Sequence, residues 1–458
     1  MIDRINRIVV VGGGISGLAA AHRLIALGQT NVTLIEASPR LGGTIQTECR
    51  DGFLIERGPD SFISEKPEAL ELAKQLGLES RLIQTNEKFR RSFIVQGGRL
   101  RAVPEGFQLL APSRLWPFLT SDIFSIAGKM RMAADLVLPR KSTNGTQDES
   151  LASFVRRRLG HEALERMAQP MVGGIYTADP ETLSLRATLP RFLDMERKHR
   201  SLIVAMLRQG QAQKSGTSGA RYSLFLSFDR GVQVLVDALA RIKADIRLNT
   251  RVESVRLNNR VWTITTNTGE LEAGAVCLAV PAYIAASLLD GSLPGKFRQM
   301  KYASTATLNF GYERSAVQHP LDGFGFVVPF IEKRSLIACT FSSVKFSGRA
   351  PDGHVLLRAF AGGALQPDIF ALDESEMAAR VEADLRELLS ITAKPLFTEV
   401  AKWERSMPQY EVGHLDRVNE IENEVSKLPG LALAGNAYRG AGIPDCIRSG
   451  QVAADSIL

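Results

Sequence analysis

Near its N-terminus the chain reads Ile8-Val9-Val10-Val11-Gly12-Gly13-Gly14-Ile15-Ser16-Gly17. The β-branched run 8–11 predicts a buried strand, and the Ala- and Leu-rich residues up to 27 predict a helix that begins within the glycines. A second strand over 31–35 is expected to end at Glu36. Gly-x-Gly-x-x-Gly between a strand and a helix, with an acid at the end of the next strand, indicates a dinucleotide-binding βαβ unit.

Each part of this unit has a physical role. Gly12 makes the tight turn, Gly14 lets the backbone approach a pyrophosphate, and Gly17 allows close packing of helix on strand. The helix N-terminus offers unpaired N–H groups and the positive end of its dipole to phosphates. Glu36 accepts hydrogen bonds from an adenosine ribose, and its charge disfavours a 2′-phosphate. A glycine-rich structural turn would explain the glycines alone, but not the strand, helix and acid in register with them.

Composition narrows the class of protein. The chain has 458 residues, and domains of about 150 residues are typical, so two or three domains are expected. Hydrophobic residues make up 45% and charged residues 23%, which excludes a disordered or fibrous chain. Lys and Arg number 56 against 49 Asp and Glu. This excess favours anionic partners: nucleic acid, an acidic membrane face or a polycarboxylate substrate.

Cysteine, histidine and hydropathy patterns exclude further classes. The four cysteines lie far apart, which argues against a disulfide framework and favours a reducing compartment. The six histidines show no ligand spacing, so no metal site is expected. The longest uncharged run, 273–289, is shorter than the ~20 residues of a transmembrane helix and contains Pro281, so no spanning segment is predicted. The apolar stretch 8–21 contains three consecutive glycines and is a poor export signal.

The remaining pattern predicts an α/β core to which an α+β part is added. The polar segments 139–150 and 209–221 are expected to be linkers, and Ser150 is the expected N-cap of the helix that follows it. Helices are predicted over 107–138 (short and amphipathic), 151–208 and 374–389. Strands are predicted over 246–252, 261–266 after a turn at Asn258-Asn259, 306–312, 324–328, 336–341 and 355–361.

A second glycine turn follows Glu36 in Ala37-Ser38-Pro39-Arg40-Leu41-Gly42-Gly43-Thr44. It resembles the extension shared by flavoproteins of the amine oxidase superfamily, in which it wraps the flavin side of the pyrophosphate. The C-terminal strand and turn 431–435 and the helix opened by 443–450 resemble the unit that runs beside the isoalloxazine ring there. No second Gly-x-Gly-x-x-Gly follows a strand, so no NAD(P)H site is expected, and electrons are expected to pass to O2 or a soluble acceptor.

From residue 7 to the end, the chain resembles the flavin-dependent porphyrinogen oxidases of haem synthesis, the protoporphyrinogen and coproporphyrinogen oxidases. The forms Gly58-Pro59-Asp60-Ser61-Phe62 and Ile443-Pro444-Asp445-Cys446 look most like the Gram-positive-type branch, whose members favour coproporphyrinogen III. The resemblance implies the use of FAD and O2 to remove six electrons from a porphyrinogen in three hydride transfers, with release of H2O2. The stretches that carry it are 12–17, 36–44, 56–62, 174–176, 198–201, 323–325, Trp403 with 407–410, and 442–446.

The resemblance also implies an architecture and a set of site residues. The implied domains are a Rossmann-type FAD-binding domain (1–88 with 227–284 and 402–458), a mixed-sheet substrate-binding domain (89–105 with 205–226 and 285–401) and a helical insertion near the substrate entrance and the membrane (106–204). The residues implied to hold FAD without a covalent link are Gly12, Gly13, Gly14, Ile15, Ser16, Gly17, Glu36, Ala37, Arg40, Gly42, Gly43, Thr44, Gly58, Pro59, Asp60, Ser61, Val252, Trp403, Gly435, Gly442, Ile443 and Pro444.

The porphyrinogen slot is implied to be lined by Gly174, Phe324, Gly325, Val327 and Phe360. Ordinary core packing is the alternative for the three large side chains. No catalytic side chain and no metal are implied, because the flavin itself accepts the hydride.

The propionate anchor is expected to differ from that of eukaryotic members, which carry an Arg where this chain has Ser92. We expect Arg91 to contact the propionates, with Arg90, Arg99 and Arg101 as further candidates. A solvated surface charge is the alternative for each of them.

Basic and apolar side chains alternate over 90–141, which favours either contact with an anionic membrane or an access lid packed inward. We expect a cytoplasmic protein, attached peripherally to the inner face of the membrane if that contact forms, without a nucleic-acid partner and compatible with a homodimer. Cys446 is expected to be a buried neutral thiol. The functional alternatives are a flavin amine oxidase or carotenoid desaturase on the same scaffold, and a non-catalytic flavin- or haem-binding protein.

Overall fold

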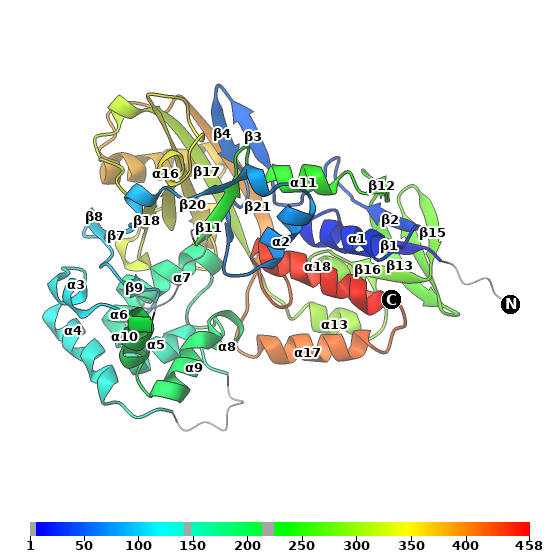
Figure 1. The fold of residues 1–458 in the computed structure, drawn as a ribbon, viewed down its shortest axis with the longest axis horizontal. Helices are drawn as coiled ribbons and strands as arrows, with labels where there is room; N and C mark the ends of the chain where they lie inside the picture. Colours follow the sequence, from blue (N-terminus) through cyan, green and yellow to red (C-terminus); the bar gives the residue numbers. More distant parts are fainter. Residues whose placement is uncertain (1–5, 142–147, 213–223) are drawn as a thin grey trace.

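The computed structural model describes residues 6–141, 148–212 and 224–458. Figure 1 shows an elongated molecule with a helix-covered parallel sheet at one end and a second large sheet and a group of helices at the other. The predicted fold class, a Rossmann-type α/β domain joined to a mixed sheet and a helical insertion, is confirmed.

The N-terminal strand lies in the centre of a five-stranded parallel sheet. Its side chains alternate, because Ile8 and Val10 pack into one hydrophobic cluster while Val9 and Val11 pack into another. Both faces of the strand are therefore buried, as its unbroken apolar sequence requires. In order across the sheet, the strands are β12 (Asp245–Arg247), β2 (Val32–Ile35), β1 (Ile8–Val11), β16 (Ala275–Leu278) and β22 (Leu431–Leu433).

Helices cover one face of this sheet, and helices with a small antiparallel sheet cover the other. On the first face α1 (Ile15–Ala26) packs along α18 (Ile443–Ile457), where a Cβ on Gly450 would collide with the carbonyl oxygen of Ser16. A glycine at this crossing lets the two helices approach closely. The opposite face is covered by α12 (Ala282–Leu288), α13 (Leu293–Phe297), α17 (His414–Val425), β13 (Val252–Asn258), β14 (Val261–Thr266) and β15 (Gly269–Ala273).

The second large sheet is mixed, because β18 runs parallel to β7 but antiparallel to β19. One of its faces packs against α16 (Glu374–Leu389), which has the predicted bounds. The N-cap Asp373 of this helix accepts a 2.8 Å hydrogen bond from the Glu376 amide. The strands are, in order, β21 (Phe397–Pro408), β17 (Tyr302–Glu313), β20 (His354–Gly362), β19 (Ala338–Phe341), β18 (Gly325–Val327), β7 (Phe93–Gln96) and β8 (Arg99–Ala102).

Shorter elements connect the strands of these two sheets along the chain. They include β3 (Thr47–Arg50) paired with β4 (Phe53–Glu56), the sheet of β5 (Phe62–Ile63), β11 (Phe225–Phe228) and β6 (Leu82–Gln84), and the helices α2 (Glu68–Gln75) and α11 (Gln233–Leu239).

The helical part forms its own hydrophobic cluster at the end of the molecule far from the N-terminus (Figure 1). Ser150 caps its helix as predicted, accepting a 3.2 Å hydrogen bond from the Ser153 amide. Residues 142–147 and 213–221 of the two predicted linkers lie outside the described residues. The helices are α3 (Leu115–Thr120), α4 (Ile126–Ala133), η3 (Ala134–Leu136), α5 (Leu151–Arg158), α6 (His161–Ala163), η4 (Leu164–Ala168), α7 (Gln169–Tyr176), α8 (Leu185–Thr188), α9 (Pro190–His199) and α10 (Leu202–Ala212).

Two details of the predicted strands are wrong. The expected strand over 246–252 is broken, because β12 joins the parallel sheet beside β2 whereas β13 pairs with β14. The chain changes sheets in between, where Asn249 has a φ of 53°. The following turn falls at Asn259-Arg260, one residue later than predicted, and both residues have positive φ, as a two-residue hairpin loop requires.

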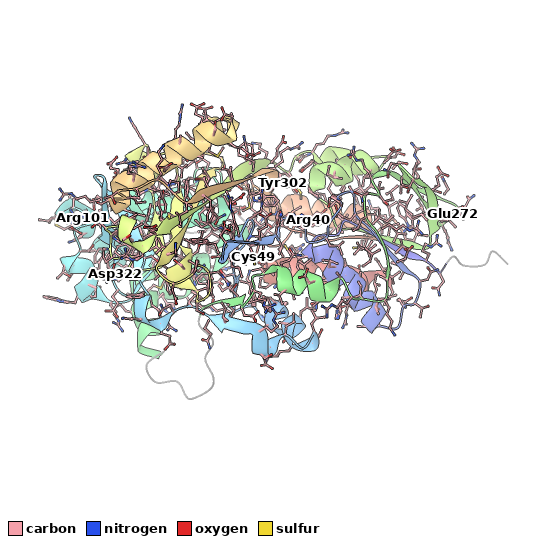
Figure 2. The ribbon with its side chains drawn as sticks, turned by 90° about the horizontal axis from the view of Figure 1, so that it is seen from above. Arg40, Cys49, Arg101, Glu272, Tyr302 and Asp322 are labelled. Atoms are coloured by element: carbon pink, nitrogen blue, oxygen red, sulfur yellow. The ribbon has the colours of Figure 1, made fainter. Side chains whose placement is uncertain are left out.

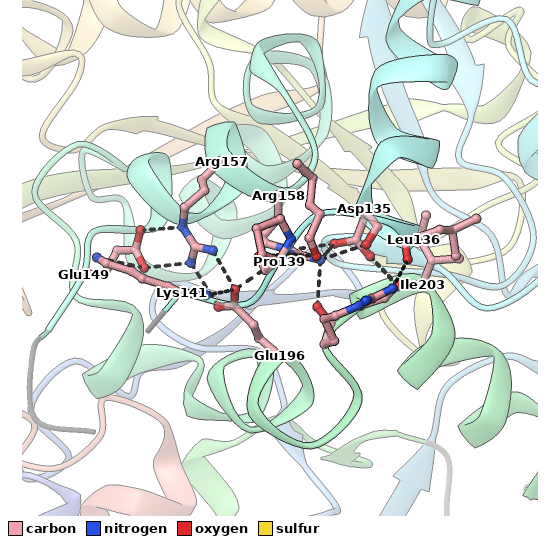
Figure 3. Close-up of polar contacts among 12 residues, drawn as sticks. Asp135, Leu136, Pro139, Lys141, Glu149, Arg157, Arg158, Glu196 and Ile203 are labelled. Carbon is pink, nitrogen blue, oxygen red and sulfur yellow. Dashed lines mark hydrogen bonds and ion pairs between the residues drawn. The ribbon is translucent and has the colours of Figure 1, made fainter. Parts of the chain in front are cut away.

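A network of buried ion pairs holds the helical part together (Figure 3). Arg158 and Asp135 are both fully buried, and the Arg158 Nε lies 2.7 Å from the Asp135 Oδ1. The second carboxylate oxygen of Asp135 accepts hydrogen bonds from the Ser201 hydroxyl at 2.6 Å and the Ile203 amide at 3.1 Å. One carboxylate thus joins η3, α5 and the start of α10, and its removal would leave an unpaired guanidinium in the core.

We predict that Asp135→Ala lowers the free energy of unfolding of the helical part by about 3 to 5 kcal/mol, because it strands the buried charge of Arg158. Asp194→Ala is the matched control, since it removes an exposed carboxylate paired with Arg197 and should cost less than about 1 kcal/mol. Thermal unfolding followed by circular dichroism measures both. Equal losses of stability in the two variants would contradict the prediction.

Candidate functional site

Two helix N-termini meet at the carboxyl edge of the parallel sheet. Gly14 is the N-cap of α1 and Gly442 the N-cap of α18, and neither cap makes a side-chain hydrogen bond. The first turns of the two helices are in contact, since Ser16 hydrogen-bonds to the thiol of Cys446. Both positive helix ends are therefore turned to the edge at which such sheets bind nucleotides.

The three motif glycines differ in the space around them. A Cβ on Gly12, whose φ is 106°, would collide with the carbonyl oxygen of Ala279, and one on Gly17 would collide with that of Gly12. A Cβ on Gly14 would have no heavy atom within 4 Å. Gly12 and Gly17 are thus required by the fold, whereas Gly14 leaves open the space that a diphosphate needs to reach the helix N-terminus. The residues present fit a dinucleotide.

Glu36 lies beside this loop. Its carboxylate accepts hydrogen bonds from the amides of Gly13 at 2.7 Å and Ser38 at 2.8 Å, so it is fixed at the end of β2. Its carbonyl oxygen accepts a 2.9 Å hydrogen bond from the Thr250 amide. This bond brings the start of β13, with Val252, to the same corner as Glu36 and Ala37.

The second glycine turn folds back onto the first. Gly42 forms a parallel bridge with Gly14, and its amide donates to the Gly13 carbonyl at 2.8 Å. The guanidinium of Arg40 holds the turn, donating to the carbonyls of Leu41 at 3.1 Å, Gly43 at 2.5 Å and Ile45 at 3.0 Å. Burial lowers the pKa of Arg40. Arg40 therefore shapes the turn through its own backbone, in the middle of the molecule (Figure 2).

The loop Gly58-Pro59-Asp60-Ser61 packs directly on this turn. A Cβ on Gly58 would collide with the Thr44 carbonyl oxygen, so the two backbones touch. The carboxylate of Asp60 is inside the protein and accepts a 2.9 Å bond from the Lys345 ammonium. Burial alone would raise the pKa of Asp60, but Lys345 and Arg358 hold it well below its usual range. Asp60 is therefore a stable anion at neutral pH.

The closing loop 434–442 is held from both sides. The Gly435 amide donates to the Ser449 hydroxyl at 3.0 Å. The Tyr410 hydroxyl donates to the Asn436 carbonyl at 2.5 Å and accepts from the Gly440 amide at 2.9 Å. Tyr410 was not among the predicted site residues, although it ends a family stretch, and an aromatic residue two positions after Pro408 in that stretch was the available signal.

Cys446 lies in the first turn of α18, beside Ile443 and Pro444. Burial raises the pKa of its thiol to about 12. The thiol is therefore protonated at neutral pH and is not a nucleophile for a covalent flavin link.

The predicted slot residues lie on and beside β18 and β20. Gly325 has a φ of 141°, and a Cβ there would collide with the Cys339 carbonyl oxygen, so only glycine fits. A Cβ on Gly174 of α7 would lie 3.7 Å from a methyl of Val327, which places the helical part against the sheet at this point. Phe324 and Phe360 are half-buried, unlike the fully buried Phe326. Part of each ring is therefore available to a ligand.

The backbone of Arg91 lies next to the slot, since its carbonyl accepts a 2.8 Å hydrogen bond from the Phe324 amide, but its side chain is not free. Its side chain is 51% exposed and pairs with Asp322, donating to the Asp322 carbonyl at 2.7 Å. Figure 2 shows Asp322 near Arg101 at the end of the molecule away from Arg40. Arg90 and Arg101 are likewise in exposed ion pairs with Glu87 at 2.8 Å and Asp122 at 2.6 Å. A cation that does lie beside a slot residue is Arg358, which stacks on the Phe360 ring.

Sequence reasoning missed Arg358, which is only 4% exposed and whose guanidinium lies 4.6 Å from the centre of the Phe360 ring. The signal was a single cation within the apolar run of β20. Within the described ranges, no cluster of His, Cys, Asp or Glu could hold a metal ion. No helix among those residues is long and apolar enough to cross a membrane.

Comparison with known proteins finds flavoprotein relatives over almost the whole chain. Residues 15–458 match the family model described as flavin containing amine oxidoreductase. The chain is 36% identical to a coproporphyrinogen III oxidase of Bacillus subtilis (strain 168), over 100% of this chain and 99% of that protein. It is 30% identical to a chloroplastic protoporphyrinogen oxidase of Nicotiana tabacum, over 98% and 85% of the two chains.

A solved structure shows the same fold along its full length. The crystal structure of a candidate protoporphyrinogen oxidase from Exiguobacterium sp. 255-15 superposes with a TM-score of 0.88 at 33% identity, over 98% of each chain. A putrescine oxidase bound to putrescine superposes with a TM-score of 0.69 at 18% identity and shares the fold.

We predict that Gly14→Val folds but loses bound flavin, because the new side chain enters open space that the diphosphate would occupy. The affinity for FAD should fall about tenfold or more, which is about 1.4 kcal/mol. The absorbance of the purified protein at flavin wavelengths measures how much flavin stays bound. Gly295→Val is the control, since a Cβ at Gly295 also meets nothing within 4 Å and lies in α13, away from this edge. A yellow Gly14→Val protein would contradict the assignment.

Proposed function

We propose that this chain, which belongs to the family of flavin containing amine oxidoreductases, uses FAD to oxidise a porphyrinogen to a porphyrin in haem biosynthesis. FAD is its cofactor, and the chain is an oxidoreductase. The observation that carries the proposal is the half-buried apolar wall of β18 and β20 lying against the nucleotide-side loops, in a chain that matches a coproporphyrinogen III oxidase from end to end.

Bound FAD would supply the hydride acceptor, so the protein has to hold a flat, apolar macrocycle against it. Phe360 and Val327 offer apolar surface, and Gly174 and Gly325 keep the backbone without side chains where the ring must come close. The two turns at Gly14 and Gly43 would fix the diphosphate end, since a Cβ on Gly43 would lie 3.3 Å from the Cα of Gly14. No proton-transferring side chain is needed at this wall, since every group on it acts by position.

Coproporphyrinogen III is the proposed substrate and O2 the proposed acceptor, with H2O2 as the second product. Three of the relatives, at 32% to 36% identity, are named coproporphyrinogen III oxidase. The plant protoporphyrinogen oxidases among the relatives reach 27% to 31%.

We predict that the purified yellow protein converts coproporphyrinogen III to a fluorescent porphyrin faster than it converts protoporphyrinogen IX, with H2O2 formed. Phe360→Ala should lower kcat/KM by about tenfold or more while FAD stays bound, because it removes the wall and not the cofactor site. Phe370→Ala is the control, since that half-buried ring packs into the cluster on the other face of the sheet. Porphyrin formation no faster than autoxidation would end the proposal, and turnover of amines would favour an amine oxidase.

We also propose that the helical part docks peripherally on an anionic membrane. Phe118, Phe124 and Leu110 are buried in its core, so part of the apolar pattern packs inward as the lid alternative expects. Other apolar side chains are exposed: Leu115 by 46%, Trp116 by 75%, Leu119 by 55%, Ile126 by 78%, Met130 by 65% and Val137 by 74%. Arg140, Lys141 and Lys198 lie close to the end of this face, and exposed apolar groups rimmed by cations are typical of an interfacial contact.

We predict that the protein cosediments with vesicles containing phosphatidylglycerol but not with pure phosphatidylcholine vesicles, with a blue shift of Trp116 fluorescence on binding. Ile126→Glu should weaken binding by about tenfold, since it places a charge in the apolar face. Leu396→Glu is the control, because Leu396 is also exposed, by 53%, but lies in the loop before β21. Equal binding by the two variants would contradict the proposal.

A further inference from the structure

The loop 56–61 is held by the substrate-side sheet through its carbonyl groups. The Glu56 carbonyl accepts from the Asn309 amide nitrogen at 3.3 Å, and the Gly58 carbonyl accepts from the Arg358 guanidinium. The Arg57 carbonyl accepts from both Thr307, at 2.5 Å, and Trp403, at 2.9 Å. These donors come from β17, β20 and β21, strands that lie more than 200 residues later in the chain.

The carbonyl groups of residues 56–58 are taken up by the sheet, so the backbone N–H groups of the loop are its remaining polar groups. Among the described residues, the amides of Gly58, Asp60 and Ser61 have no hydrogen-bond acceptor. Unpaired backbone donors in a partly buried loop are costly unless a ligand takes them up. The loop also touches Thr44, in the turn that folds onto the diphosphate-binding glycines. The amides are thus available to the oxygen and nitrogen acceptors of a flavin.

Arg358 connects this loop with the porphyrinogen wall. Its guanidinium bonds to the Gly58 carbonyl, lies 3.7 Å from the Asp60 carboxylate and stacks on the Phe360 ring at 4.6 Å. Its Nε has no partner among the described residues, although the side chain is almost wholly buried. Three basic side chains, Arg358, Lys345 and Arg349, face two acidic ones, Asp60 and Glu56, so one net positive charge is left inside the protein where loop and wall meet.

We infer that Arg358, assisted by Thr307, is a positioning residue that sets the loop amides against the flavin and places a positive charge beside its ring. This inference rests on the flavin site argued above and deepens the proposed oxidation. A buried cation favours the negatively charged state of a neighbouring group. The reduced flavin is the more negative state, so Arg358 should raise the midpoint potential of the bound flavin and tighten its binding.

The test compares Arg358→Met, Arg358→Lys and Thr307→Val in the full-length protein. The measurements are the dissociation constant for FAD, obtained by titrating flavin-free protein, and the midpoint potential and visible spectrum of the bound flavin. Arg358→Met should bind FAD about tenfold more weakly and have a more negative potential. Arg358→Lys should restore the potential but not the affinity, because it keeps the charge and loses the planar donor. Thr307→Val should weaken FAD binding and leave the potential unchanged, because valine has nearly the shape of threonine but lacks the hydroxyl donor, and the substitution changes no charge.

Arg334→Met is the matched control. Arg334 is 16% exposed, precedes β19 of the same sheet, and pairs with Asp384 at 3.1 Å, away from the loop. It should leave FAD affinity, potential and spectrum at wild-type values even if stability falls.

Unchanged affinity and potential in Arg358→Met would overturn the inference, as would equal changes in Arg334→Met. If Arg358→Met does not fold, the nearly isosteric Thr307→Val decides, and unchanged FAD affinity in that variant overturns the inference. All readouts are made without porphyrinogen. A wild-type protein that forms no porphyrin but shows these flavin effects would therefore refute the proposed function and leave this inference standing.

Discussion

Three close backbone contacts made by glycines hold the site together. Gly17 of α1 lies against Gly12 of the first turn, Gly42 pairs with Gly14, and Gly58 lies against the carbonyl of Thr44. Each contact stacks a later loop on an earlier one, so the strand–helix unit, the second turn and the loop 56–61 form one continuous layer. A Cβ at Gly17 or Gly58 would separate the layer, and everything that a cofactor contacts would move with it.

The second sheet completes this layer from a distant part of the sequence. Carbonyls of residues 56–58 are taken up by side chains of β17, β20 and β21, so the nucleotide side cannot reach its final shape until the large sheet has formed. The same sheet carries the half-buried Phe360 on its inner face. The strands that hold the loop 56–61 and the strand that carries Phe360 therefore belong to one sheet.

Sequence alone predicted the elements whose signals are local. The glycine unit, the Ser150 cap and the bounds of α16 follow from residues within one turn of each other, and the structure confirms them. The break between β12 and β13 was missed because it depends on which sheet each half joins. The pairing of Arg91 with Asp322 joins residues 231 apart, and no spacing rule could indicate that an anchor predicted from its charge would already have a partner.

The buried arginines of this molecule differ in whether all of their N–H groups have acceptors. Among the described residues the buried arginines are Arg158, Arg349 and Arg358. Every nitrogen of Arg158 has an acceptor, from Asp135 and the carbonyls of Leu138, Pro139 and Arg200, so its charge is spent entirely on joining helices.

Arg349 is likewise satisfied by Ser227 and by the carbonyls of Phe228 and Asp229. Arg358 keeps one donor unpaired and stacks on a ring that is itself only half covered. A fold that gains nothing from such a donor would lose stability by burying it, since an unsatisfied buried polar group costs about 1 to 3 kcal/mol. The unpaired donor of Arg358 lies beside the Gly58 loop, which is where we infer that a flavin would bind and offset this cost.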